Sequence, residues 1–143
     1  MVVQAPIVVV SNRGPVTFGP DGPRRGAGGL VTAMTAALAE REVVWVAAAM
    51  SEEDRSHAGG LVEVEGLPPI AFVDIPPDRF AGYYDGYANR VLWFLHHGLE
   101  EEPYVTEANE TWADYVATNE AFADRIADLA APGASILGSR HMW

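Results

Sequence analysis

Hydrophobic and polar positions divide the first third of the chain into two strand-like segments around a helix-like one. Two continuous apolar runs, Ile7–Val10 and Val43–Ala48, are typical of strands that are covered on both faces. Between them, apolar residues recur at every fourth position over Leu30–Arg41, which predicts an amphipathic helix. Strand, helix and strand in this order need a crossover connection, so the two strands are expected to pair in parallel.

The rest of the chain is mostly helical in its periodicity. Apolar residues repeat at intervals of three and four over Thr111–Ala130, where Thr111 and Asp114 resemble a capping box and Pro132-Gly133 would end the helix. The whole pattern predicts an α/β fold, a Rossmann-like parallel sheet with flanking helices. The further elements expected are strands over Leu61–Glu65, Ile70–Ile75 and Ser135–Leu137, a capped turn over Ser51–Arg55, a loop over Thr17–Arg25, and helices over Asp78–Tyr87 and Asn89–His97.

Composition narrows the class of protein. A length of 143 residues predicts one domain, and the formal charge of −11 argues against a nucleic-acid partner or an anionic membrane surface. With no cysteine, the chain has no disulfide, thiolate metal site or thiol nucleophile. No apolar run approaches the ~18 residues of a membrane span, and the amino terminus does not resemble a signal peptide. A cytoplasmic protein is therefore expected.

The loop after the first strand carries the first candidate chemistry. It begins with Ser11-Asn12-Arg13-Gly14-Pro15 and ends with Gly26-Ala27-Gly28-Gly29 before the helix. A strand, a glycine-rich loop and a helix present backbone N–H groups to an anion, and Arg13 adds a forked positive charge that suits phosphate. The spacing matches neither a dinucleotide fingerprint nor a Walker loop. The alternative is an ordinary turn whose glycines only let helix and sheet approach closely.

Two further groups invite a functional interpretation beside a structural one. Arg24 and Arg25 could cover a phosphate as a flexible cationic lid, although a solvated charge pair is the favoured interpretation. Tyr84 and Trp93 could wall a sugar pocket, because amphipathic rings stack on sugar faces, or they could be core residues.

The segment Asn89–His97 is expected to place its side chains on two neighbouring faces. Val91, Leu92 and Leu95 share one face, whereas Trp93 and His97 lie four residues apart on the next. His96 and His97 are adjacent and point in different directions. They are expected to be one packed and one exposed residue, and no metal site is predicted.

Several short motifs occur in a fixed order along the chain. They are Ser11-Asn12-Arg13, Gly28-Gly29-Leu30, Trp45, Tyr83-Tyr84, Asn89, Val91-Leu92-Trp93, His96-His97, and Trp112, Tyr115, Asn119 and Phe122. Together they resemble the amino-terminal part of the trehalose-6-phosphate synthase family over Ile7 to Leu137.

The resemblance implies a fold and an activity. The family has two Rossmann-like domains, the GT-B arrangement, and moves glucose from a nucleotide sugar, usually UDP-glucose, to glucose 6-phosphate with retention. It implies no metal and no cofactor other than the nucleotide sugar as co-substrate. Arg13 would hold the acceptor phosphate with help from Tyr84 and Trp93, and Gly29 would let the donor's phosphate approach the loop. Gly28 is included among the substrate-binding residues. No catalytic residue is assigned to this chain.

The sequence also departs from the family pattern. The family's Trp-x-Gly-Trp-x-Gly is replaced by Trp45-Val46-Ala47-Ala48-Ala49-Met50, as in relatives that use other acceptors, including pseudo-glycosyltransferases. The family's His-Asp-Tyr-His-like motif is replaced by Gly138-Ser139-Arg140-His141. The acceptor domain is therefore placed at 1–137, followed by an atypical tail at 138–143 that is non-native or frame-shifted. The nucleotide-binding domain is absent from the sequence.

Three functions remain open at this stage. The first is part of a glycosyltransferase that is inactive alone and binds a nucleotide sugar only when a second domain is supplied. The second is a non-catalytic or regulatory module that binds a sugar phosphate, with an exposed apolar face and possible homo-oligomer formation. The third is an independent nucleotide-binding domain, which is disfavoured because no acidic residue ends the strand Val43–Ala48.

Overall fold

The computed structural model describes residues 4–26, 28–98 and 105–138. These residues form two compact units, which are described separately. Unit 1 runs to Asp74 and resumes at Phe122, and unit 2 covers Ile75–Ala121.

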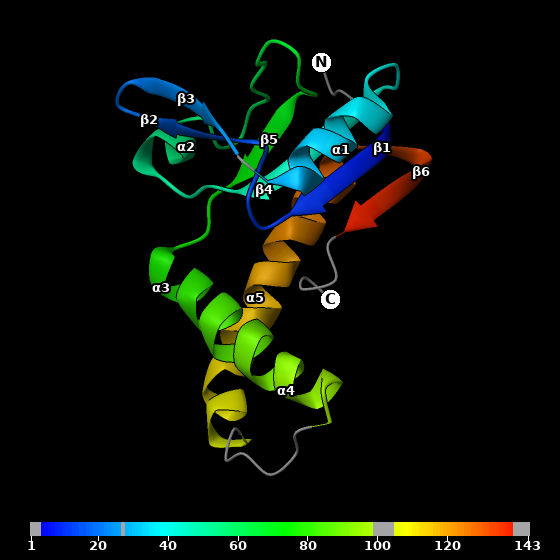
Figure 1. Cartoon of the computed structure of the whole chain (residues 1–143). Helices are drawn as coiled ribbons and strands as arrows, with labels where there is room; N and C mark the ends of the chain where they lie inside the picture. Colours follow the sequence, from blue (N-terminus) through cyan, green and yellow to red (C-terminus); the bar gives the residue numbers. More distant parts are fainter. Residues whose placement is uncertain (1–3, 27, 99–104, 139–143) are drawn as a thin grey trace. The chain divides into compact units, whose positions relative to one another are not determined.

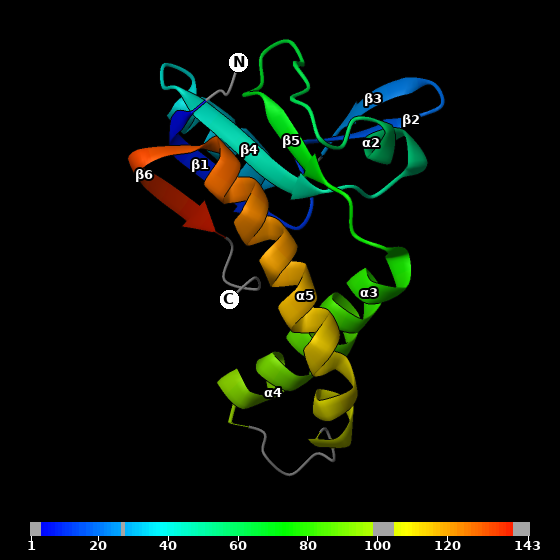
Figure 2. The same ribbon diagram turned by 180° about the vertical axis from the view of Figure 1, so that it is seen from behind.

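Unit 1 is built on a four-stranded sheet in the order β5-β4-β1-β6, in which every neighbouring pair is parallel (Figures 1 and 2). Its strands are β1 (Ala5–Ser11), β4 (Val43–Ala48), β5 (Ile70–Val73) and β6 (Ala130–Gly138). This confirms the predicted α/β fold and the parallel pairing of the two apolar runs. The last predicted strand, Ser135–Leu137, is the end of the longer β6.

The core of unit 1 follows directly from the apolar runs. All six residues of β4 are buried, and Val8 at the centre of β1 is fully buried. The helix α1 (Gly29–Leu38) packs on one face of this sheet through Met34 and Leu38. It ends three residues before the predicted Arg41, because the chain turns there to enter β4, with the Arg41 N–H donating to the Leu38 carbonyl at 3.0 Å.

The segment predicted as a loop over Thr17–Arg25 is instead a β-hairpin. Strands β2 (Val16–Gly19) and β3 (Gly22–Arg25) pair antiparallel around Pro20 and Asp21. The short turn is possible because Gly22 adopts a φ of +108°, which other residues rarely do. The prediction was wrong because proline, glycine and arginine are abundant in loops.

The strand predicted over Leu61–Glu65 does not form. This segment makes only one isolated antiparallel bridge, between Val62 and Ile70. Glycines bound it on both sides, and Gly59 and Gly66 both have positive φ, so the chain bends before a longer ladder can develop. The predicted capped turn does form, as helix α2 (Glu52–Ser56) with Ser51 as its N-cap.

Unit 2 contains one continuous helical run where two separate helices were predicted. It consists of α3 (Pro77–Ala81), the π-helix η1 (Gly82–Leu92) and α4 (Trp93–His96). The i→i+5 bonds of a π-helix change the angle between successive side chains, so the α-helical face assignment fails. Val91 is 3% exposed whereas Leu95, predicted on the same face, is 47% exposed.

The long helix α5 (Val105–Leu129) begins in unit 2 and ends in unit 1. It starts before Thr111, so the predicted capping box is wrong. Thr111 and Asp114 instead lie against Gly86 and Gly82 of η1, where an added Cβ would collide with them. The helix ends at Leu129, because Pro132 and Gly133 already belong to β6. Its last part contributes Phe122, which is fully buried, to unit 1.

Candidate functional site

The carboxyl end of β1 holds the backbone of Arg13 through two successive side-chain hydrogen bonds. The buried indole Nε1–H of Trp45 donates to Ser11 Oγ at 2.7 Å. The Ser11 hydroxyl in turn donates to the Arg13 carbonyl at 2.6 Å. Because Ser11 and Trp45 are both buried, this chain of bonds is shielded from water, whereas the Arg13 side chain is exposed. The backbone of Arg13 is therefore fixed just after the carboxyl end of β1, while its side chain is exposed to solvent.

Gly28 and Gly29 form the amino terminus of α1, where space is left open. A Cβ added at either position would meet no atom within 4 Å, and neither residue has a positive φ. At Gly14, by contrast, an added Cβ would lie 3.1 Å from the Ala47 Cβ. Close packing therefore explains Gly14 but not Gly28 and Gly29. Gly28 provides no capping side chain, and the first turn of α1 contains no acid, so its N–H groups suit an anion.

The base of the β2–β3 hairpin connects these two features. The Gly26 N–H donates to the Pro15 carbonyl at 2.9 Å, which joins the chain shortly after Arg13 to the chain shortly before Gly28. Arg13, Gly28 and Gly29, called here the arginine–glycine site, thus lie at the two ends of one hairpin within unit 1.

Arg24 fits the favoured interpretation as a solvated charge, whereas Arg25 is bonded to a backbone carbonyl. Arg24 lies 3.9 Å from Asp21, with the two side chains 75% and 91% exposed, so this ion pair contributes little. Arg25 donates through Nη2 to the Glu65 carbonyl. A guanidinium held in this way is not a flexible lid.

The predicted sugar-binding rings, Tyr84 and Trp93, both lie in unit 2. Tyr84 is half-buried and stacks on Phe80 with ring centroids 5.6 Å apart. Trp93 is 41% exposed, and its ring stacks on His97 at 4.1 Å. Neither ring is an enclosed core residue, in contrast to the fully buried Tyr83. Because these rings belong to unit 2 and the arginine–glycine site to unit 1, their joint contact with one ligand stays a prediction.

The two adjacent histidines differ in their contacts. His97 packs on Trp93, and its Nδ1 lies 2.7 Å from the Trp93 carbonyl oxygen, whereas His96 has no ring contact of this kind among the described residues. Both remain exposed. Within the described residues, no three histidine or acidic side chains gather as a metal site.

An aromatic cluster joins η1 to α5 within unit 2. Tyr87 and Tyr115 have ring centroids 4.5 Å apart, and Trp112 stacks on Tyr115 at 5.5 Å. Burial raises the pKa of Tyr115 because it disfavours the phenolate, and the neighbouring Tyr87 raises it further.

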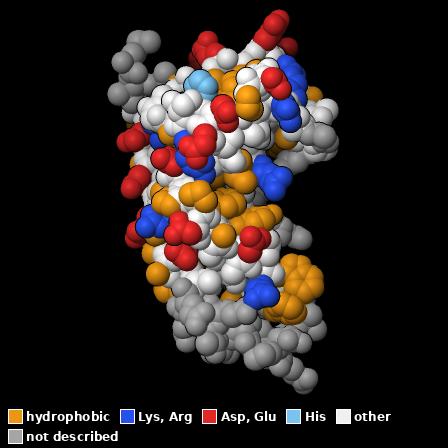
Figure 3. All heavy atoms as spheres, turned by 90° about the vertical axis from the view of Figure 1, so that its left-hand side faces the viewer, with side chains coloured by type: hydrophobic (Ala, Val, Ile, Leu, Met, Phe, Trp, Pro, Cys, Tyr) orange, Lys and Arg blue, Asp and Glu red, His pale blue; other side chains and the backbone are white. Residues whose placement is uncertain are grey.

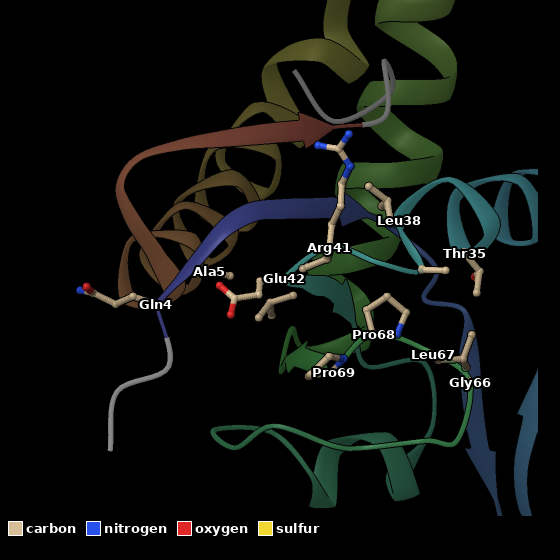
Figure 4. Close-up of a pocket in the computed structure, with 13 residues that line it drawn as sticks. Gln4, Ala5, Thr35, Leu38, Arg41, Glu42, Gly66, Leu67, Pro68 and Pro69 are labelled. Atoms are coloured by element: carbon tan, nitrogen blue, oxygen red, sulfur yellow. The ribbon is translucent and has the colours of Figure 1, made fainter.

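A pocket of about 530 Å³ lies at the amino ends of the strands (Figure 4), whereas Arg13 follows the carboxyl end of β1. It is lined by the amino ends of β1 and β4, the end of α1 and the segment before β5, including Ala5, Leu38, Val43 and Pro69. In parallel α/β sheets, ligands bind at the carboxyl ends of the strands. The pocket is therefore separate from the arginine–glycine site.

One buried acid was missed as a positioned group. Asp54 has no exposed surface, and its carboxylate accepts hydrogen bonds from the N–H groups of Phe18 at 2.7 Å and Met50 at 2.9 Å. The sequence analysis predicted only a capped turn over Ser51–Arg55, with no role for Asp54. The Ser51-x-x-Asp54 spacing was the available signal, because it is a capping pattern.

The surface shows no region of a single charge sign on the face in Figure 3, where acidic and basic side chains are interspersed with apolar atoms. Among the helices that the structure describes, none is long and apolar enough to cross a membrane.

Comparison with known proteins agrees with the fold. The sequence profile of glycosyltransferase family 20 matches residues 6–138. A bifunctional trehalose-6-phosphate synthase/phosphatase of Thermoproteus tenax is 36% identical over 89% of this chain, which spans only 18% of that protein.

Two solved structures resemble most of this chain. An α,α-trehalose 6-phosphate synthase of Burkholderia multivorans has a TM-score of 0.67 and 26% identity, covering 97% of this chain and 29% of its own. The N-terminal domain of a trehalose-6-phosphate phosphatase of Candida albicans has a TM-score of 0.64 and 27% identity, covering 92% of this chain and 27% of its own.

Proposed function

This chain belongs to glycosyltransferase family 20, and we propose that it is the acceptor-binding, amino-terminal part of a trehalose-6-phosphate synthase. The reaction proposed for the whole enzyme is transfer of glucose from UDP-glucose to glucose 6-phosphate. The observation that carries this proposal is the arginine–glycine site, where an exposed guanidinium and an uncapped helix terminus are joined through one hairpin base.

Different residues are proposed to bind the phosphate and the sugar ring of a phosphorylated sugar. Arg13 can form charge-assisted, forked hydrogen bonds to a phosphate, and the N–H groups behind Gly28 and Gly29 add donors without side chains in the way. Tyr84 and Trp93 are proposed to contact the sugar ring. Such a site positions an acceptor, while the charge on a leaving diphosphate needs groups that this chain is not proposed to supply.

Calorimetric titration with glucose 6-phosphate tests the acceptor site. Arg13→Ala is expected to weaken binding by about tenfold or more, the effect of losing hydrogen bonds to a charged group. Arg24→Ala is the matched control, because it removes an equally charged but solvated arginine, and it should leave binding nearly unchanged. Equal losses for both variants, or no binding by the unmodified chain, would refute the site.

A non-catalytic sugar-phosphate-binding module is the second candidate. The likeness to the N-terminal domain of a Candida albicans phosphatase favours it, because that domain belongs to a protein named for another activity. The 143-residue chain, supplied with UDP-glucose and glucose 6-phosphate, is expected to release no UDP and form no trehalose 6-phosphate. Adding the carboxy-terminal domain of a family member distinguishes the candidates, since only an acceptor domain of an enzyme would then support transfer.

The acceptor identity and a cytoplasmic location are part of the same proposal. Ala47 and Ala48 are buried at the positions where the family pattern has its first glycine and its second tryptophan. A titration panel of glucose 6-phosphate against other phosphorylated sugars and cyclitols tests whether this change alters the acceptor.

A further inference from the structure

The buried Asp54 and the half-buried Ser51 bond the β2–β3 hairpin as a clamp from the amino end of α2. Asp54 accepts from the Phe18 N–H, and the Ser51 hydroxyl donates to the Phe18 carbonyl at 2.7 Å. Ser51 Oγ also accepts from the backbone N–H of Asp54 at 2.9 Å, so the backbone of Asp54 holds the Ser51 side chain in place. Both backbone groups of Phe18 are therefore satisfied by side chains that lie more than thirty residues further along the chain.

This clamp replaces the strand pairing that the hairpin lacks. Among the described residues, β2 and β3 form a two-stranded sheet of their own, separate from the four-stranded sheet. An isolated two-stranded hairpin is marginally stable in water. Here the ring of Phe18 also packs against His57 at 4.7 Å and meets Phe72 edge-on at 6.1 Å. Figure 1 shows the hairpin running beside α2.

The hairpin is the covalent connection between the two halves of the arginine–glycine site. Its first strand starts three residues after Arg13, and its second ends three residues before Gly28. Its base is closed by the bond from Gly26 to Pro15. The bonds of Ser51 and Asp54 to Phe18 fix this hairpin, so they also limit the motion of the two chain segments that lead from its base to Arg13 and to Gly28.

We propose that Asp54 is a positioning residue of the arginine–glycine site, acting through Phe18 and the hairpin on a phosphorylated ligand held by Arg13 and the amino end of α1. This inference rests on the proposed acceptor site. A carboxylate is required at Asp54 because its two oxygens accept from two N–H donors, Phe18 and Met50. The amide of asparagine would turn an N–H₂ group toward one of these donors.

The test compares Asp54→Asn with Glu53→Gln, which removes the same charge from the same helical turn. Glu53 is only half-buried, and its side chain makes no hydrogen bond or ion pair in the described part of the chain. Amide hydrogen exchange over Val16–Arg25 and titration with glucose 6-phosphate are measured on each protein. Asp54→Asn is expected to raise hairpin exchange selectively over exchange in β1 and β4, and to weaken ligand binding by about tenfold.

The sign of the binding change separates positioning from electrostatics. Removing a negative charge should strengthen anion binding, as expected for Glu53→Gln, whereas loss of positioning weakens it. If Asp54→Asn does not fold, Ser51→Ala provides the second variant, since it removes the bonds of Ser51 Oγ to the Phe18 carbonyl and the Asp54 N–H and keeps both bonds of the Asp54 carboxylate. Weaker binding with a faster-exchanging hairpin supports the proposal for either variant.

Two outcomes would overturn the inference in distinguishable ways. Binding by both clamp variants equal to that of Glu53→Gln would refute positioning while leaving the acceptor site intact. Failure of the unmodified chain to bind glucose 6-phosphate would remove the acceptor site and the positioning role together, whatever the exchange data show.

Discussion

Replacing Ser11 by alanine should be costly for so small a change, because one hydroxyl serves two partners. It accepts from the Trp45 indole at 2.7 Å and donates to the Arg13 carbonyl at 2.6 Å. Trp45 is 1% exposed, so its N–H would be left buried without an acceptor. An orphaned buried donor costs about 1–3 kcal/mol and a lost hydrogen bond about 0.5–1.5 kcal/mol, which gives about 1.5–4.5 kcal/mol in total.

Urea unfolding followed by far-ultraviolet circular dichroism measures this loss in the free energy of unfolding. Trp45→Phe provides the partner variant, because it removes the indole donor and leaves the Ser11–Arg13 bond in place. The double variant should be less destabilised than the sum of the singles, by a coupling of about 1–2 kcal/mol. A loss below about 0.5 kcal/mol for Ser11→Ala, or strict additivity of the two changes, would show that the bond is not energetically important.

Three further predictions concern the glycines, the aromatic cluster and the sheet edge. Gly14→Ala should lower the free energy of unfolding by about 1 kcal/mol or more in urea titrations, because its Cβ would crowd Ala47. Gly28→Ala should leave stability nearly unchanged and weaken glucose 6-phosphate binding in calorimetry. Tyr115 has a raised pKa in the folded state, so its contribution to stability is fully present below the unfolded pKa of about 10 and is lost as pH rises through the folded value. Urea unfolding at rising alkaline pH should show a smaller decline for Tyr115→Phe. Leu137, 44% exposed on the uncharged edge strand β6, favours self-association, and Leu137→Lys should reduce it in sedimentation velocity experiments.

The buried strands could be predicted because their signal is local. Val43–Ala48 and Ile7–Val10 are continuous apolar runs, and such runs have few alternatives to a covered parallel strand. The hairpin could not be predicted in the same way, because what holds Phe18 in place comes from Ser51 and Asp54, far along the chain. The π-helix was missed because its spacing is set by backbone hydrogen bonds that leave no periodic trace in the residue types.

The candidate site shows the same difference between residues with a local sequence signal and residues held by distant contacts. Arg13, Gly28 and Gly29 could be selected from their motif. The structure adds that neither Gly28 nor Gly29 is needed for close packing. Asp54 could not be recognised as a positioned carboxylate, because its partners are backbone N–H groups, which every residue except proline carries.

The number of residues in the π-helix η1 affects how the side chains after it are turned about the helix axis in unit 2. A π-helix contains more residues per turn than an α-helix, so Gly82–Leu92 carries surplus chain in its helical winding. Deleting one residue there would remove part of this surplus and favour i→i+4 bonds, and the resulting change of winding sets how far Trp93 and Leu95, both exposed now, turn about the axis. The direction in which the Trp93 side chain points thus depends on the number of residues in η1, and a deletion there would redirect it without a substitution at Trp93.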